Sequence, residues 1–134
     1  MSYGMTVGTQ GPFPATVARV RDALKAQGFG VLTEIDMRST MREKLGQEMD
    51  DYLILGVCNP SLAHQALGVD PSVGLLLPCT VVVRADAGQT LVEALDPQTM
   101  VAITGQPGLG PVADEAARRL RAALDSLSDH PGTG

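Results

Sequence analysis

Hydrophobic and polar residues alternate along several short segments of the chain, which is the two-residue period of a β-strand. In the second of these segments, Val31 and Ile35 fall on one face while Glu34 and Asp36 fall on the other. The predicted strands are residues 3–9, 29–36, 52–58, 75–84 and 90–95. Together they predict a sheet of about five strands.

Two of these strands have special positions in the predicted sheet. Residues 52–58 are apolar on both faces, which favours an interior strand. Pro78 falls inside residues 75–84, and a proline has no N–H to donate to a ladder. We therefore expect an edge or a bulge at Pro78.

Between the strands, apolar residues recur every three or four positions, which indicates helices. Capping residues, prolines and glycines mark where these helices begin and end. The predicted helices run from Pro14 to Gly28, from Ser39 or Thr40 to Gly46, from Asn59 and Pro60 to Gly68, from Asp96 and Pro97 to about Ala102, and from Val112 to about Leu127. The last helix is the most amphipathic, and the residues that we expect to face inward are Val112, Ala116, Leu120, Ala123, Leu124 and Leu127.

The order of the elements predicts the fold class. A turn at residues 86–88 joins the last two strands into a hairpin, so at least part of the sheet is antiparallel. We expect an α+β fold, a two-layer α/β sandwich with a mixed or antiparallel sheet and helices packed on one face. The 134 residues fit a single domain, 1–134, with 129–134 as a flexible tail that includes His130.

Four sequence motifs occur together in a fixed order. They are residues 28–36 (GFGVLTEID), 55–60 (LGVCNP), 74–79 (GLLLPC) and 94–97 (ALDP). In this combination the chain resembles the domain-of-unknown-function 302 family, over about residues 5–127. The resemblance implies a compact two-layer α/β fold that tends to associate as a dimer. It implies no established reaction and brings no catalytic residues.

Composition and charge exclude several functional classes. The formal net charge is −5, and there is neither a basic stripe nor a set of stacking aromatics, so we expect no nucleic-acid binding. No apolar run approaches the roughly 20 residues that span a bilayer, so we expect no membrane insertion. The start of the chain lacks the pattern of a signal peptide, which predicts a cytoplasmic protein with free thiols rather than a disulfide.

The two cysteines and one histidine provide the first candidate site. Thiolates of Cys58 and Cys79 with the imidazole of His64 would suit zinc or copper(I). Their spacing matches no zinc finger or ribbon and no fourth ligand is evident, although a dimer could join two half-sites. The alternative is that both cysteines are small buried hydrophobic residues and His64 is a polar helix residue.

A second interpretation is thiol chemistry at Cys58. It directly precedes a predicted helix N-terminus, where free amides and the helix dipole can lower the pKa of a thiol. His64 lies six residues further on and points to a different side of the helix axis, and a C-x-x-C motif is absent. A thiol enzyme therefore remains an alternative.

Polar residues on the predicted second strand and third helix offer further ligand contacts. Glu34 and Asp36 lie two apart on one strand face, where they could act together or simply be solvated. The helix start at Asn59 could receive an anion. The glycine-rich residues 105–110 lack a phosphate-binding pattern and predict a connector.

The sequence favours a non-enzymatic cytosolic binding module, assembled as a homodimer. Its ligand would be a small molecule, a haem or a metal near Cys58, His64 and Cys79, with Asn59, Glu34 and Asp36 as further ligand-binding candidates. Haem is included because a lone imidazole beside aliphatic residues can serve as an axial ligand. The alternatives are a thiol-dependent enzyme using Cys58 and a structural or interaction domain without a site.

Overall fold

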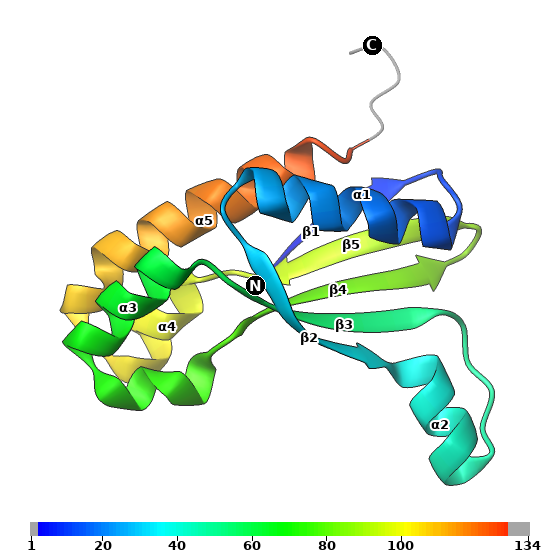
Figure 1. Ribbon diagram of the computed structural model, residues 1–134, viewed down its shortest axis with the longest axis horizontal. Helices are drawn as coiled ribbons and strands as arrows, with labels where there is room; N and C mark the ends of the chain where they lie inside the picture. The colour runs from blue at the N-terminus through cyan, green and yellow to red at the C-terminus, as the bar shows by residue number, and fades with distance from the viewer. Residues whose placement is uncertain (1–2, 129–134) are drawn as a thin grey trace.

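The computed structural model describes residues 3–128, in which the strands form a five-stranded sheet in the order β1-β5-β4-β3-β2 (Figure 1). Every neighbouring pair of strands is antiparallel. The strands are β1 (Gly4–Thr9), β2 (Gly30–Asp36), β3 (Tyr52–Cys58), β4 (Cys79–Asp86) and β5 (Gln89–Leu95). The predicted tail, residues 129–134 with His130, lies outside the described residues.

Helices α1 and α5 lie over one face of this sheet (Figure 1). The helices are α1 (Phe13–Ala26), α2 (Met37–Leu45), α3 (Pro60–Val69), α4 (Gln98–Thr104) and α5 (Gly110–Asp125), with short 3₁₀ helices η1 (Pro71–Leu76) and η2 (Pro107–Leu109). The predicted two-layer α+β fold is confirmed. Within residues 3–128, no helix is both long and apolar enough to cross a membrane.

Strand periodicity decides which side chains enter the main core. In β4, Val81 and Val83 are fully buried under the helices while Val82, between them, is only half-buried on the open face. The main core comprises Met5, Val7, Val20, Leu24, Phe29, Leu53, Leu55, Val57, Val81, Val83, Val92, Ala94, Leu120, Ala123, Leu124 and Leu127. The sheet is therefore covered on one face and open on the other.

A second, smaller core lies at the end of the sheet, where α3 and α4 pack beside the first half of α5 (Figure 1). Its residues are Leu62, Ala66, Val73, Met100, Leu109, Val112, Ala113 and Ala116. The 16 residues of α5 span about 24 Å, which is long enough to enter both cores. All the residues predicted to face inward from this last helix are buried, as expected.

The fourth strand differs from its prediction. Residues 75 and 76 belong to η1, and β4 begins at Cys79, so Pro78 precedes the strand rather than lying within it. The expected edge or bulge at Pro78 was therefore wrong, because β4 is an interior strand paired on both sides with β3 and β5. Since Pro78 stands outside the ladder, its missing N–H leaves no strand partner unsatisfied.

The second helix begins earlier than predicted. Asp36, not Ser39 or Thr40, caps α2: its Oδ1 accepts the Ser39 backbone N–H at 3.0 Å. This hydrogen bond is the main reason that the pKa of Asp36 is lowered from its usual value. The strand β2 thus runs directly into α2 without a loop, which the polar pattern around residue 39 did not indicate.

Candidate functional site

The pairing of β3 with β4 brings the two cysteines to the same end of the sheet. Cys79, the first residue of β4, lies opposite Val57, and Cys58 is the next residue of β3. The approach of the chain to β4 depends on Gly56, because a Cβ there would lie only 2.8 Å from Cγ of Pro78. A glycine at this position lets Pro78 pack against β3 and so sets where Cys79 enters the sheet.

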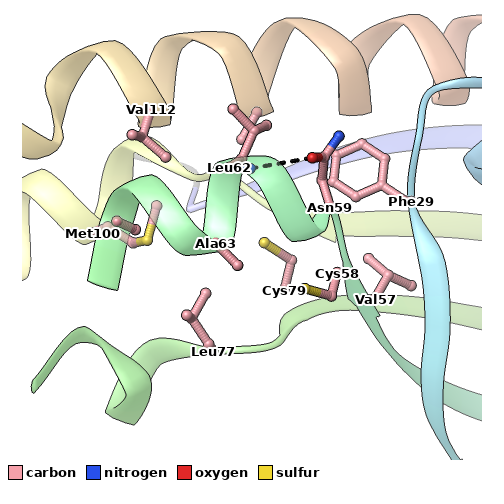
Figure 2. A pocket seen from close by; sticks show the side chains of 12 residues that line it. Phe29, Val57, Cys58, Asn59, Leu62, Ala63, Leu77, Cys79, Met100 and Val112 are labelled. Atoms are coloured by element: carbon pink, nitrogen blue, oxygen red, sulfur yellow. Dashed lines mark hydrogen bonds between the residues drawn. The ribbon is translucent and has the colours of Figure 1, made fainter. Parts of the chain in front are cut away.

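Cys58 and Cys79 line one small cavity, which we call the thiol pocket (Figure 2). Its volume is about 20 Å³. The residues that line it are Phe29, Val57, Cys58, Asn59, Leu62, Ala63, Ala66, Leu77, Cys79, Met100, Val112 and Ala116. Because these residues come from both the main core and the second core, the pocket lies at the junction of the two.

The lining of the thiol pocket is almost entirely apolar. Among residues 3–128, no histidine, carboxylate, lysine or arginine lines it, and the one amide side chain is that of Asn59. The Oδ1 atom of Asn59 accepts the Leu62 backbone N–H at 3.2 Å, so Asn59 caps α3 as its sequence position predicted. Its use as a ligand-binding residue stays a prediction.

Burial raises the pKa of the Cys79 thiol, and the neighbouring Cys58 raises it further. An apolar pocket disfavours the negatively charged thiolate form of a cysteine. A second negative charge nearby disfavours that form further. Cys79 is therefore a neutral thiol at neutral pH.

His64 is not brought to the thiol pocket. It lies on α3, where Leu62 and Ala66 face the core, and its own side chain is exposed. In the described part of the chain, no three histidine, cysteine, aspartate or glutamate residues form a group that could hold a metal ion. Cys58 and Cys79 thus converge without the imidazole predicted to accompany them.

The thiol pocket is also too small for a haem. Pockets for organic ligands usually have volumes of about 300 Å³ or more, whereas this cavity has about 20 Å³. The exposed His64 does not line it. The dimensions therefore suit an occupant no larger than a single atom or a water molecule.

Glu34 and Asp36 serve separate partners. The Glu34 carboxylate pairs with Arg21 of α1 at 2.6 Å, and Asp36 caps α2. Both side chains are exposed, so the Glu34–Arg21 ion pair contributes little to stability. Their joint role in ligand binding stays a prediction.

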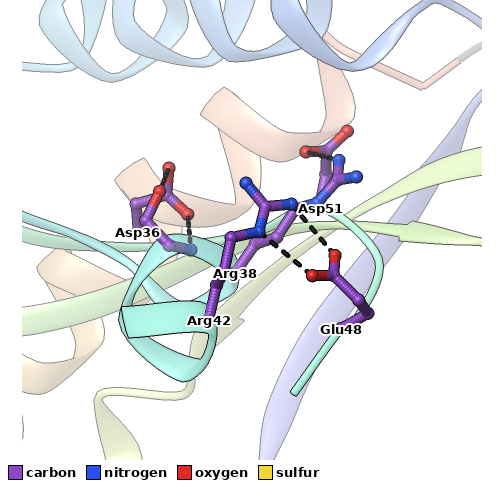
Figure 3. A network of polar contacts seen from close by, with 6 residues as sticks. Asp36, Arg38, Arg42, Glu48 and Asp51 are labelled. Atoms are coloured by element: carbon purple, nitrogen blue, oxygen red, sulfur yellow. Dashed lines mark hydrogen bonds and ion pairs between the residues drawn. The ribbon is translucent and has the colours of Figure 1, made fainter. Parts of the chain in front are cut away.

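Ion pairs hold the chain that follows α2 against this helix (Figure 3). Arg42 binds both carboxylate oxygens of Glu48, at 3.2 and 3.0 Å, and Arg38 contacts Asp51 at 3.0 Å. Every one of these side chains is at least 40% exposed, so water weakens the attraction. We interpret this network as organising the loop between α2 and β3.

A larger groove of about 350 Å³ lies on the open face of the sheet. Its lining residues are Tyr3, Gly4, Tyr52, Thr80, Val82, Glu93, Ala94 and Leu95. Its one ionisable carboxylate, Glu93, is already engaged by Arg84 at 2.7 Å and by the Thr6 hydroxyl at 3.2 Å. The groove is large, but its carboxylate, Glu93, already accepts hydrogen bonds from Arg84 and Thr6.

Sequence reasoning missed Met100 as a residue of the thiol pocket. It is 6% exposed, comes from α4, and lines the pocket together with Cys58 and Cys79. Nothing in the local sequence indicates this position, because a buried methionine in a short helix is most often ordinary core packing. Only the packing of α4 beside α3 and α5 places a third sulfur at this cavity.

Comparisons with known proteins agree on one family. The family model described as "Domain of unknown function DUF302" matches residues 5–127. The fold is similar to the crystal structure of an uncharacterized conserved DUF302 protein from Bacillus stearothermophilus, with 32% sequence identity, a TM-score of 0.89, and coverage of 95% of this chain and 99% of that chain. No curated protein matches the chain. The resemblance drawn from the four sequence motifs is confirmed.

Proposed function

The chain belongs to the DUF302 family, and for this member we propose a binding function: Cys58 and Cys79 hold a soft metal ion in the thiol pocket. The single observation that carries the proposal is the convergence of two thiols from neighbouring strands on one small apolar cavity. Soft thiolate ligands select metals such as copper(I) and zinc. Binding of the metal would displace the proton of the Cys79 thiol, whose pKa is raised by burial.

The geometry of the pocket supports a metal ion over an organic ligand. A cavity of about 20 Å³ holds roughly one water-sized sphere. Both cysteines lie at strand ends, where backbone ladders and the cap at Asn59 restrict their movement. Two donor atoms held in place by rigid elements are what a small ion requires.

The same lining argues against a thiol-dependent enzyme. A nucleophilic thiol needs a base within hydrogen-bond reach to activate it. In the described part of the chain, no histidine or carboxylate lines the thiol pocket, and the exposed His64 lies outside it. Burial moreover raises the pKa of Cys79, which lowers the fraction of reactive thiolate.

The proposal is tested by titrating the reduced, metal-free protein under anaerobic conditions. Copper(I) and zinc(II) are added separately, each against a chromogenic chelator of known affinity. We expect at least one of the two metals to bind at one equivalent per chain. If copper(I) binds, we expect an absorption band from sulfur-to-metal charge transfer. If the chelators retain both metals at every ratio, the metal-binding function is overturned.

We further propose that the protein assembles as a homodimer through β2 and α2, which together we call the arm. Neither element has a buried residue, and Leu32, Ile35 and Leu45 are 65%, 46% and 65% exposed. In Figure 1 the arm extends away from α1 and α5. A nine-residue helix without a fully buried residue gains little from its own propensity, so a partner surface would stabilise it.

An edge strand supports the choice of a second copy as that partner. β2 is at the end of the sheet, so one side of its backbone has no strand to pair with. Antiparallel pairing of β2 with its own copy satisfies twofold symmetry, in which the same patch is used by both subunits. Such pairing would also cover the exposed apolar side chains of the arm.

Native mass spectrometry at micromolar concentration tests the assembly. We expect a dimer for the wild type and a monomer for the Leu32→Asp/Ile35→Asp variant. Ile103→Asp is the matched control, because Ile103 is an exposed apolar residue of α4, 68% accessible and outside the arm. A monomeric wild type, or equal loss of dimer in the control, would contradict the interface.

A further inference from the structure

We infer that the thioether of Met100 is a third sulfur ligand in the thiol pocket and that it makes the site selective for copper(I) over zinc(II). This inference rests on the proposed metal-binding function. It adds a ligand that belongs to a different element, α4, and it names the metal.

Met100 lies across the thiol pocket from the two cysteines. Figure 2 shows Met100 on one side of the space beside α3 and Cys58 and Cys79 on the other, with Ala63 and Leu77 along the walls. All three sulfur-containing side chains therefore border the same cavity. Met100 is 6% exposed, so its thioether is shielded from water.

Cys79 and Met100 also line a second cavity together. This cavity of about 30 Å³ is also lined by both residues, together with Leu76, Leu95, Pro97, Thr99 and Ile103. Cys79 and Met100 thus border empty space on two sides. A methionine side chain has three rotatable bonds, so Met100 can change its rotamer at these cavities without displacing the backbone.

The adjoining cavity lies next to exposed residues of β5 and α4. Ile103 and Leu95, which line it, are 68% and 36% exposed. Met100 and Cys79 line both cavities, whereas Cys58 lines only the thiol pocket.

The donor set favours copper(I). Thiolate and thioether sulfur atoms are soft ligands that select copper(I), and two or three of them complete its coordination. Zinc sites usually take four ligands from thiolate, imidazole and carboxylate groups. The lining contributes neither imidazole nor carboxylate, so zinc would lack its remaining partners. The thioether adds a neutral ligand, which an apolar pocket accepts more readily than a further charge.

The test compares Met100→Leu with Met5→Leu. Both methionines are 6% exposed, but Met5 lies in the main core and does not line the thiol pocket. Methionine-to-leucine changes keep the volume of the side chain, so both variants should fold. We expect Met100→Leu to raise the dissociation constant for copper(I) by about 10-fold or more and to leave that for zinc(II) unchanged. Met5→Leu should change neither.

A spectroscopic signal distinguishes ligation from packing. The methyl groups of methionine are labelled with carbon-13, and the metal-free protein is titrated with copper(I). The methyl resonance of Met100, assigned by its absence in Met100→Leu, should shift with one equivalent, while that of Met5 stays in place. A stationary Met100 resonance with equal copper(I) affinities in the two variants overturns the inference.

Failure of this inference can be told apart from failure of the proposed function. If the wild type and Met100→Leu bind copper(I) equally while Cys58→Ser/Cys79→Ser does not bind, the dithiol site stands and Met100 is core packing only. If the wild type itself leaves copper(I) with the chelator, the site and its third ligand are both overturned.

Discussion

Replacing Cys58 and Cys79 together by serine is expected to abolish the binding of soft metal ions. Of the residues that the structure describes, the two cysteines provide the only ionisable donors at the thiol pocket, and a serine hydroxyl is a hard group that stays protonated at neutral pH. Removing a residue that only hydrogen-bonds a metal ligand typically lowers the metal affinity about 10- to 100-fold. Replacing either cysteine alone, which removes a ligand itself, should lower the affinity by at least as much. The measurement is a chelator competition with copper(I) under anaerobic conditions.

His64→Ala is the matched control for the cysteine variants. The exposed side chain of His64 lies outside the pocket, so we expect the affinity of this variant to equal that of the wild type. A loss as large as that of Cys79→Ser would mean that the imidazole is a ligand, supplied by a second copy of the chain. The dithiol site within one chain would then be wrong.

The affinity for the metal should also rise with pH. The pKa of Cys79 is raised by burial and by Cys58, so at neutral pH the metal must displace a proton from this thiol. Raising the pH removes part of that competition and strengthens binding until the thiol is ionised. Affinity that falls with pH, in a buffer that does not bind copper(I), would contradict the assignment of Cys79 as a ligand.

Leu55→Ala is expected to lower the free energy of unfolding by about 2–5 kcal/mol, the range for a buried leucine. Leu55 is 0% exposed and lies in the interior strand β3, beneath α1 and α5. Its truncation leaves a cavity that rigid neighbours cannot fill. Urea unfolding followed by circular dichroism measures the loss, with all proteins at one concentration because a dimer's stability depends on it.

Ile54→Ala provides a control from the next position of the same strand. Ile54 points to the open face and is only half-buried, so its truncation should reduce stability by about 1 kcal/mol. Equal losses at the two positions would contradict the assignment of the covered face. The pair is informative because the sequence of this strand is apolar on both sides.

Local chemistry explains why so many elements were predictable. Asn59 and Pro60 start a helix through a side-chain cap and a preset backbone angle, and neither depends on distant residues. Gly28 ends α1 with a positive φ of 84°, which a glycine adopts without strain. The inward residues of α5 were readable because a helix repeats every 3.6 residues wherever it packs.

The errors arose where two local signals competed. Pro78 stands in an apolar run that resembles a strand, but the run is divided between η1 and β4, and the proline occupies the break. Asp36, Ser39 and Thr40 are all capping residue types, and the helix begins at the first because β2 leads directly into it. The pattern of side chains alone does not decide between such alternatives.

The sequence alone determined the order of strands and helices, most helix ends, the inward face of α5 and the residue types available for chemistry. The tertiary structure decided which of those residues meet. Cys58 and Cys79 converge because β3 pairs with β4. Met100 lies beside them because α4 packs next to α3 and α5. His64, close to Cys58 in sequence, faces solvent because its helix buries the opposite side. The physical reason is the difference between local and long-range interactions. Helix caps and periodicity depend on residues a few positions apart, whereas a binding site depends on contacts between segments far apart in the chain.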